Sequence, residues 1–152
     1  VLLSGPLGGS AGGLRALRTK QAEASLIEAH RRPTPRLVEG TVAREAGVRC
    51  AMDVSDGLGL DLARLARASG VGVSLDDVAV AEGATEAEAL GGGEDYELLL
   101  ITSDPERLVE AFEANGLRAP IRIGELVADS STFELRGAPM EASGYRHEVG
   151  GG

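Results

Sequence analysis

The stretch Ala51-Met52-Asp53-Val54-Ser55-Asp56-Gly57-Leu58 places two carboxylates, a hydroxyl and a glycine directly before a helical pattern. The residues from 48 to 52 are apolar except for Arg49, and they predict a short, largely buried strand. Leucines recur at helical spacing after it and predict a helix that begins near Leu58. The side chains of Asp53 and Asp56 are therefore expected where a strand becomes a helix.

Two interpretations are open for the polar residues of this junction. Ser55 or Asp56 could cap the first backbone amides of the helix, which is a purely structural role. Capping leaves Asp53 unexplained, because a carboxylate at an apolar strand end is costly to desolvate unless it meets a cation or several donors. We therefore predict that Asp53 is a ligand, and a hard divalent cation such as magnesium is its natural partner.

A second acidic stretch runs Gly91-Gly92-Gly93-Glu94-Asp95-Tyr96-Glu97-Leu98-Leu99-Leu100. Glycines let a backbone approach a ligand closely, but they also occur in flexible loops that lead into an edge strand. In the second case Glu94, Asp95 and Glu97 would merely be solvated. Taken together, the two stretches predict a site with many negative and few positive charges, which suits a metal-bridged phosphate ligand.

The pattern Asp-x-Ser-Asp-Gly-Leu at 53–58, followed by Gly-Gly-Glu-Asp-Tyr-Glu-Leu-Leu at 92–99, resembles the carboxy-terminal half of the thiamine-monophosphate kinase family. The resemblance implies an α+β fold with α/β-like layers, in which helices pack on a mixed sheet, as in the aminoimidazole ribonucleotide synthetase-like fold. Four further segments agree in order, namely Leu3 to Gly13, Arg32-Pro33-Thr34-Pro35-Arg36, Ile121 to Glu125 and Gly144-Tyr145.

The resemblance also implies a reaction and roles for individual residues. The terminal phosphoryl group of ATP would pass to thiamine monophosphate and give thiamine diphosphate. Asp53 and Asp56 would hold magnesium ions, Ser55 would touch ATP, and Glu94 and Tyr145 would hold thiamine monophosphate. Phosphoryl transfer depends on positioning and charge neutralisation rather than on a covalent nucleophile, so no catalytic side chain is assigned.

Residues 1–152 are expected to form one carboxy-terminal domain, and the amino-terminal ATP-binding domain of the family has no counterpart in them. We therefore expect the chain alone to be inactive and the complete enzyme to be a homodimer. One alternative function is a related ATP-dependent synthetase that acts on another acceptor. Another is a non-catalytic module that binds nucleotide or metal, or that serves only in assembly.

Composition narrows the class of protein. The formal net charge of −9 argues against a nucleic-acid or anionic membrane surface, and an acidic surface suits magnesium. The single cysteine, Cys50, excludes an internal disulfide and is expected to be a buried, inert thiol. A signal-peptide pattern is not evident, so a cytoplasmic location is expected.

Periodicity predicts a sheet with helices packed on it. Ser10 is expected to be the N-cap of a helix that runs toward Ala29, and Asp104-Pro105 to begin a helix that stops at Asn115-Gly116. Residues 76–90 are expected to form a loop with a short helix. A further helix is expected at 37–46, and strands at 1–4, 71–75, 97–101, 121–127 and 132–135.

Some features of the sequence have a structural interpretation beside, or in place of, a functional one. The glycine-rich turn within Gly5–Gly13 could bind phosphate or simply precede a capped helix. Arg32 and Arg36 are expected to remain solvated near a helix end. Tyr145 could pin the tail or stack on a ligand, and composition favours the first while the family resemblance favours the second. His147 is expected to be exposed.

Overall fold

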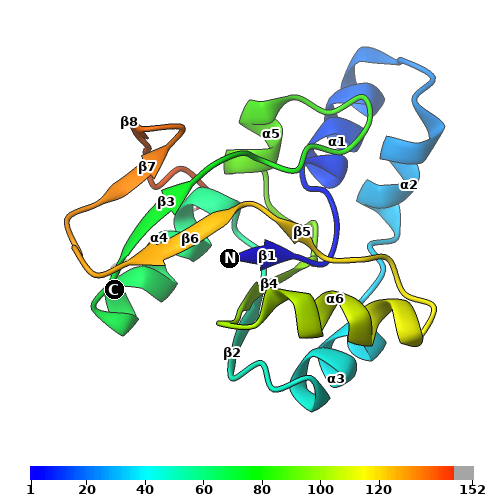
Figure 1. Ribbon diagram of the computed structural model, residues 1–152. Coiled ribbons are helices and arrows are strands. Elements are labelled where there is room, and N and C mark those ends of the chain that lie inside the picture. Colours follow the sequence, from blue (N-terminus) through cyan, green and yellow to red (C-terminus); the bar gives the residue numbers. More distant parts are fainter. Residues whose placement is uncertain (146–152) are drawn as a thin grey trace, which may run out of the picture.

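Two four-stranded sheets organise residues 1–145, which are the residues that the computed structural model describes; His147 lies outside them (Figure 1). The first sheet has the order β2-β4-β1-β5, with all neighbours antiparallel. The second has the order β6-β3-β7-β8, in which β3 and β7 are parallel. The strands are β1 (Leu2–Leu3), β2 (Cys50–Asp53), β3 (Gly72–Leu75), β4 (Leu98–Ile101), β5 (Ile121–Arg122), β6 (Gly124–Val127), β7 (Phe133–Leu135) and β8 (Ala138–Pro139).

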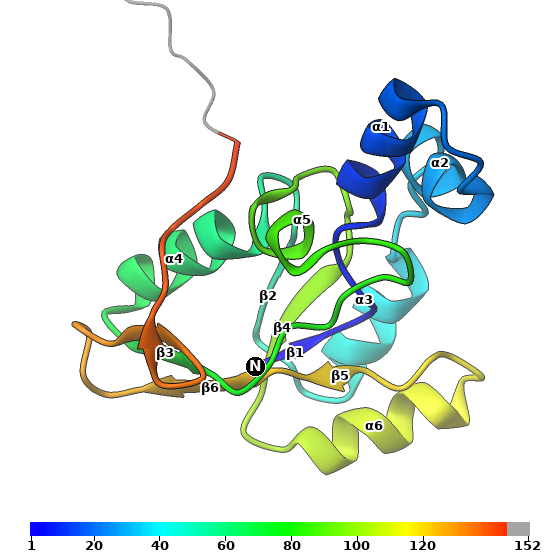
Figure 2. The same cartoon turned by 90° about the horizontal axis from the view of Figure 1, so that it is seen from above.

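Six helices accompany the sheets in this part of the chain, which confirms the α+β prediction. Figure 2 shows α4 on one side of the first sheet, and α3 and α6 on the other. Within residues 1–145, no helix is long and apolar enough to cross a membrane. The helices are α1 (Gly9–Thr19), α2 (Ala24–Arg31), α3 (Leu37–Glu45), α4 (Leu58–Ser69), α5 (Glu86–Gly91) and α6 (Pro105–Ala114).

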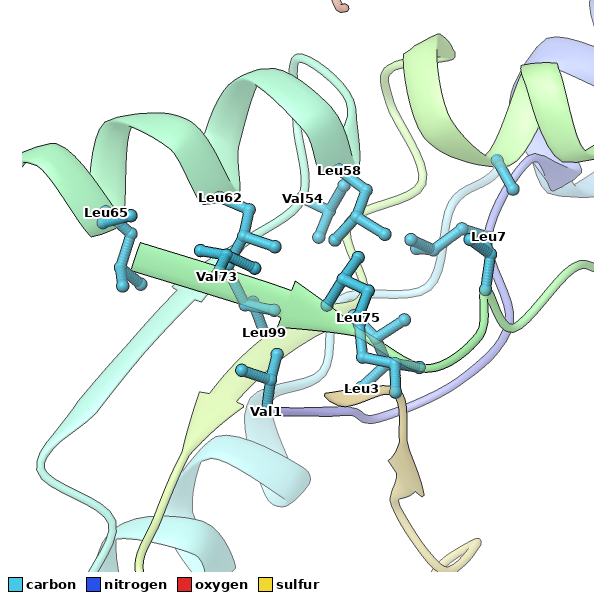
Figure 3. Close-up of a cluster of buried hydrophobic side chains, with 14 residues drawn as sticks. Val1, Leu3, Leu7, Val54, Leu58, Leu62, Leu65, Val73, Leu75 and Leu99 are labelled. Carbon is cyan, nitrogen blue, oxygen red and sulfur yellow. The ribbon is translucent and has the colours of Figure 1, made fainter. Parts of the chain in front are cut away.

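Alternation along β1 and β4 divides the core into two clusters. Leu3 and Leu99 are register partners and point toward α4 and the second sheet, where they join Leu62 and Val73 (Figure 3). Their sequence neighbours Leu2 and Leu100 point the opposite way, because successive side chains of a strand alternate between faces. That second cluster also contains Val42 of α3 and the buried Leu108 and Phe112 of α6.

Two predicted elements are divided in the structure. The strand predicted at 121–127 becomes β5, which pairs with β1, and β6, which pairs with β3, so the chain passes between the sheets at the buried Ile123. The long helix predicted from Ser10 ends at Thr19, because Lys20 adopts a left-handed conformation with φ 56°. The chain then turns back as α2, and a Cβ on Gly13 would lie only 2.0 Å from the carbonyl oxygen of Leu26.

The burial expected for the strand before Asp53 is wrong. β2 is an edge strand of the first sheet and pairs only with β4, so Ala51 and Asp53 are exposed and Cys50 is half-buried against the core. β4 in contrast lies between β2 and β1, which excludes the edge-strand interpretation of residues 97–101. An exposed carboxylate does not need a cation to offset the cost of burial. The burial argument therefore no longer supports Asp53 as a ligand, and only the family resemblance does.

Candidate functional site

A cavity of about 820 Å³ opens between the start of α4, the start of α1 and the end of α5. Both acidic stretches and the described end of the chain contribute to its wall. Among residues 1–145, it is lined by Ser10, Ala11, Leu14, His30, Ser55, Asp56, Gly91, Gly92, Gly93, Glu94, Tyr96, Gly144 and Tyr145.

Backbone hydrogen bonds join the two acidic stretches. The amide of Glu94 donates to the carbonyl oxygen of Ser55 at 2.8 Å, and that of Tyr96 donates to the carbonyl oxygen of Val54 at 3.0 Å. The approach is so close that a Cβ on Gly93 would lie 2.5 Å from the oxygen of Ser55. Glycine at this position therefore brings Ser55 and Glu94 to the same wall.

The tail completes the wall from a third direction. The amide of Tyr145 donates to the carbonyl oxygen of Asp56 at 2.8 Å, and Gly144 lies against Leu60 of α4. Tyr145 is 62% exposed and lines the cavity. The backbone thus holds the tail against the start of α4, and Tyr145 contributes to the cavity wall.

Asp61, rather than Ser55 or Asp56, holds the start of α4. The N-cap is Gly57, with φ 116° and without a side-chain cap, so the predicted caps are wrong. The Oδ2 atom of Asp61 accepts the amides of Ser55 at 3.0 Å and of Asp56 at 2.9 Å, and this carboxylate is 1% exposed. Asp61 was missed because an acid in the first turn of a helix is common without any such role.

Arg64 places a positive charge beside this junction. Its Nη1 atom lies 3.0 Å from Oδ1 of Asp61 and also donates to Oδ2 of Asp56. The hydrogen bond to Asp56 raises the pKa of the Arg64 guanidinium, so the group stays cationic. Asp56 therefore lines the cavity with a counter-ion already beside it.

Asp95 holds the glycine-rich turn before α1. It accepts the amides of Gly8 at 2.7 Å and Ser10 at 3.0 Å, and burial raises the pKa of this carboxyl while the amides partly offset that effect. The N-cap of α1 is Gly8 rather than the predicted Ser10, whose Oγ lies 3.1 Å from Nδ1 of His30. The start of α1 is thus satisfied by an internal carboxylate, which supports the ligand-free interpretation of this turn.

Glu97 and Arg36 form an ion pair in which the carboxylate is buried and the guanidinium is half-buried. Nε and Nη2 of Arg36 donate to the two carboxylate oxygens of Glu97 at 2.9 and 2.6 Å, and Oγ of Ser4 donates to the same carboxylate at 2.5 Å. Glu97 is 5% exposed. The alternative in which Glu97 is merely solvated is therefore wrong, and so is the expectation that Arg36 is solvated. Arg32 is exposed as expected, and its Nη1 atom lies 3.9 Å from Oε1 of Glu28.

Known proteins share the sequence pattern and the fold of this chain. The family model for AIR synthase related protein, C-terminal domain, matches residues 1–135. The chain belongs to this family.

Within the AIR synthase related family, the chain is similar to thiamine-monophosphate kinases. It is 33% identical over 168 residues to the enzyme of Salmonella typhimurium, with 97% of this chain and 51% of that protein covered. The crystal structure of the Stenotrophomonas maltophilia K279a thiamine-monophosphate kinase superimposes with a TM-score of 0.78 at 30% identity, covering 93% of this chain and 50% of that one. AaThiL complexed with AMPPCP and TMP gives a TM-score of 0.80 at 28% identity, covering 96% and 50%. The chain thus spans about half the length of these relatives.

The structure brings together four of the five residues assigned to ligands from the sequence. Ser55, Asp56, Glu94 and Tyr145 line the cavity, whereas Asp53 is exposed at the end of β2 and is not among its lining residues. His30 and Tyr96 also line it and were not predicted. Tyr96 belongs to the acidic stretch 92–99, and this position could have indicated a role in the site. No sequence signal indicated His30, because the fold of α2 onto α1 brings it to Ser10, 20 residues earlier in the chain.

Replacing Asp61 with Ala is expected to lower the free energy of unfolding by about 2–3 kcal/mol, because two amides lose their acceptor beside a buried site. Urea unfolding of the chain measures this effect. Asp104→Ala is the matched control, since Asp104 caps α6 with one bond of 3.1 Å on the surface and should cost only about 1 kcal/mol. Equal losses in the two variants would contradict the role assigned to Asp61.

Proposed function

We propose that the chain is the carboxy-terminal part of a kinase that transfers the terminal phosphoryl group of ATP to thiamine monophosphate and produces thiamine diphosphate. The observation that carries this proposal is the single cavity in which Ser55, Asp56, Glu94 and Tyr145 converge from separate segments. The similarity to thiamine-monophosphate kinases supports the same reaction. In that reaction Ser55 would contact ATP, and Glu94 and Tyr145 would hold thiamine monophosphate.

Magnesium would be held by Asp53 and Asp56 in this proposal. Carboxylate oxygens suit this ion, which commonly takes one or two carboxylates together with phosphate oxygens and water. Among residues 1–145, no three His, Cys, Asp or Glu side chains are grouped as an all-protein metal site requires. Two carboxylates would leave the other positions of the ion to substrate phosphate oxygens and water, and the bound ion would neutralise the phosphate charge. At Asp56 that ion would compete with the Arg64 guanidinium.

The remaining parts of the site would come from outside the chain. An amino-terminal domain would supply further groups for ATP and magnesium, and the complete enzyme would be a homodimer in the cytoplasm. The coverage of about half of each relative supports a missing domain. The chain alone would then bind magnesium-ATP weakly, because few of the charged contacts are present and water competes with them.

A phosphoryl-transfer assay tests the proposal. Thiamine monophosphate, ATP and magnesium are incubated with the chain alone and with the chain joined to the amino-terminal half of the Salmonella typhimurium relative, which we call the combined enzyme. We expect thiamine diphosphate only from the combined enzyme, because phosphoryl transfer needs both sets of positioning groups.

Two results would contradict this expectation. Turnover by the chain alone would show that no second domain is needed. A folded combined enzyme that leaves thiamine monophosphate unchanged would overturn the kinase assignment. Product analysis with other acceptors would then distinguish a related synthetase from a binding or assembly module.

A further inference from the structure

Both tyrosines of the chain line the same cavity. The sequence contains two Tyr, two Phe and no Trp. The phenylalanines serve packing, because Phe112 is fully buried and Phe133 packs against the first core cluster. Tyr96 and Tyr145 in contrast are 37% and 62% exposed. The accessible aromatic surface of residues 1–145 is therefore concentrated at the cavity.

The backbone at Glu94 and Tyr96 is strained. Tyr96 has φ 53° and Glu94 has φ 66°, a left-handed conformation that is unfavourable for residues other than glycine. Such strain persists where the surrounding structure fixes it and is typical of functional sites. Here the fixing bonds come from the neighbours, since Asp95 holds Gly8 and Ser10, and Glu97 holds Ser4 and Arg36.

Tyr96 lies in sequence between Asp95 and Glu97, and of these three residues it is the one that lines the cavity. Its amide is bonded to the oxygen of Val54 at 3.0 Å, so the backbone position does not depend on the ring. Tyr96 is 37% exposed, and it shares the cavity wall with Glu94 and with Tyr145.

Charge around the cavity favours a cation near these rings. Among the described lining residues, Asp56 and Glu94 are acids; Asp56 is already paired with Arg64, so the attraction for a ligand cation comes chiefly from Glu94. The face of an aromatic ring attracts cations, and paired rings recognise permanently charged nitrogen compounds. The thiazolium ring of thiamine is a planar group of this kind.

We propose that Tyr96 forms an aromatic pair with Tyr145 that binds the cationic ring of the substrate and selects it over an uncharged ring. This inference rests on the proposed function and adds a residue to it. The phosphate would point toward the nucleotide that Ser55 would contact in the proposed function. Tyr96 would thus act in substrate binding and selection and take no part in the transfer itself.

The test compares two ligands on the combined enzyme without ATP. Isothermal titration gives Kd for thiamine monophosphate and for thiochrome monophosphate, whose fused ring system carries no permanent positive charge. In Tyr96→Leu we expect about a tenfold weaker Kd for thiamine monophosphate and a change of about twofold or less for the thiochrome ligand. Tyr96→Phe is the matched control and should retain both affinities, because the ring face remains.

A kinetic readout separates binding from a structural defect. KM for thiamine monophosphate should rise in Tyr96→Leu by a similar factor, while KM for ATP stays unchanged. Tyr96→Asn serves as a second variant without the ring, because Asn tolerates the left-handed conformation better than Leu does. It should show the same loss of selectivity.

The outcomes are distinguishable. Equal losses of both ligands in Tyr96→Leu and Tyr96→Asn, or no loss in either variant, would overturn the role of Tyr96 while leaving the kinase assignment intact. Failure of the unsubstituted combined enzyme to bind thiamine monophosphate would overturn both.

Discussion

Asp53→Asn in the combined enzyme is expected to lower kcat by about 100-fold or more, the loss typical of removing one group that stabilises developing charge. The variant keeps the size of the side chain and removes its negative charge, so magnesium would lose a preferred oxygen ligand. Because Asp53 is exposed at the end of an edge strand, stability should change by only about 0.5 kcal/mol. Steady-state kinetics and thermal unfolding of the same preparation measure the two effects.

The matched control for Asp53 is Glu113→Gln, which removes one negative charge from an exposed position on α6. It should leave kcat within about twofold, since screened surface charges act weakly at a distance. If Asp53→Asn unfolded at a much lower temperature while its folded fraction kept full turnover, the assignment of Asp53 as a ligand would be wrong.

Glu97→Ala is expected to give the largest loss of stability, about 3 kcal/mol, because it removes a buried carboxylate that the half-buried Arg36 and the hydroxyl of Ser4 share. The substitution leaves the guanidinium of Arg36 and the hydroxyl of Ser4 without their shared acceptor. Urea unfolding of the chain, monitored by circular dichroism, measures the change. The loss should also release the backbone next to Tyr96.

A double-mutant cycle gives the control for Glu97. Arg36→Met removes the cation and keeps much of the side chain, and the double variant should be more stable than the sum of the single losses predicts. Simple additivity would mean that the contact between Arg36 and Glu97, despite its distances of 2.6 and 2.9 Å, contributes no coupling energy.

Local signals in the sequence predicted the regular elements well. The spacing of Leu58, Leu62 and Leu65 predicted α4, and Asp104-Pro105 predicted the start of α6, where Asp104 accepts the amide of Arg107. In both cases neighbouring residues decide the structure. Local signals could not predict two separate sheets. The division at Ile123 depends on β1 and β3, which pair with β5 and β6 from distant parts of the chain.

The site was predictable only in part for the same reason. The family resemblance drew attention to Ser55, Asp56, Glu94 and Tyr145, and these four residues line one cavity, while their roles stay a prediction. The partners of the buried acids were missed. Asp95 reaches Gly8, and Glu97 reaches Arg36, across sequence separations that hydrophobic periodicity does not describe.

The central position of β1 determines when the first sheet is able to form. Leu2 pairs with Leu100 on one side and with Arg122 on the other, so its partners lie far along the chain. Pairings of such long range slow folding, because a large loop must close before they give any stabilisation. During synthesis Leu2 and Leu3 must therefore wait for β4 and β5, and we infer that the first core cluster, which contains Ile121 and Ile123, consolidates only after β5 has emerged from the ribosome, whereas the second cluster is complete by Leu117.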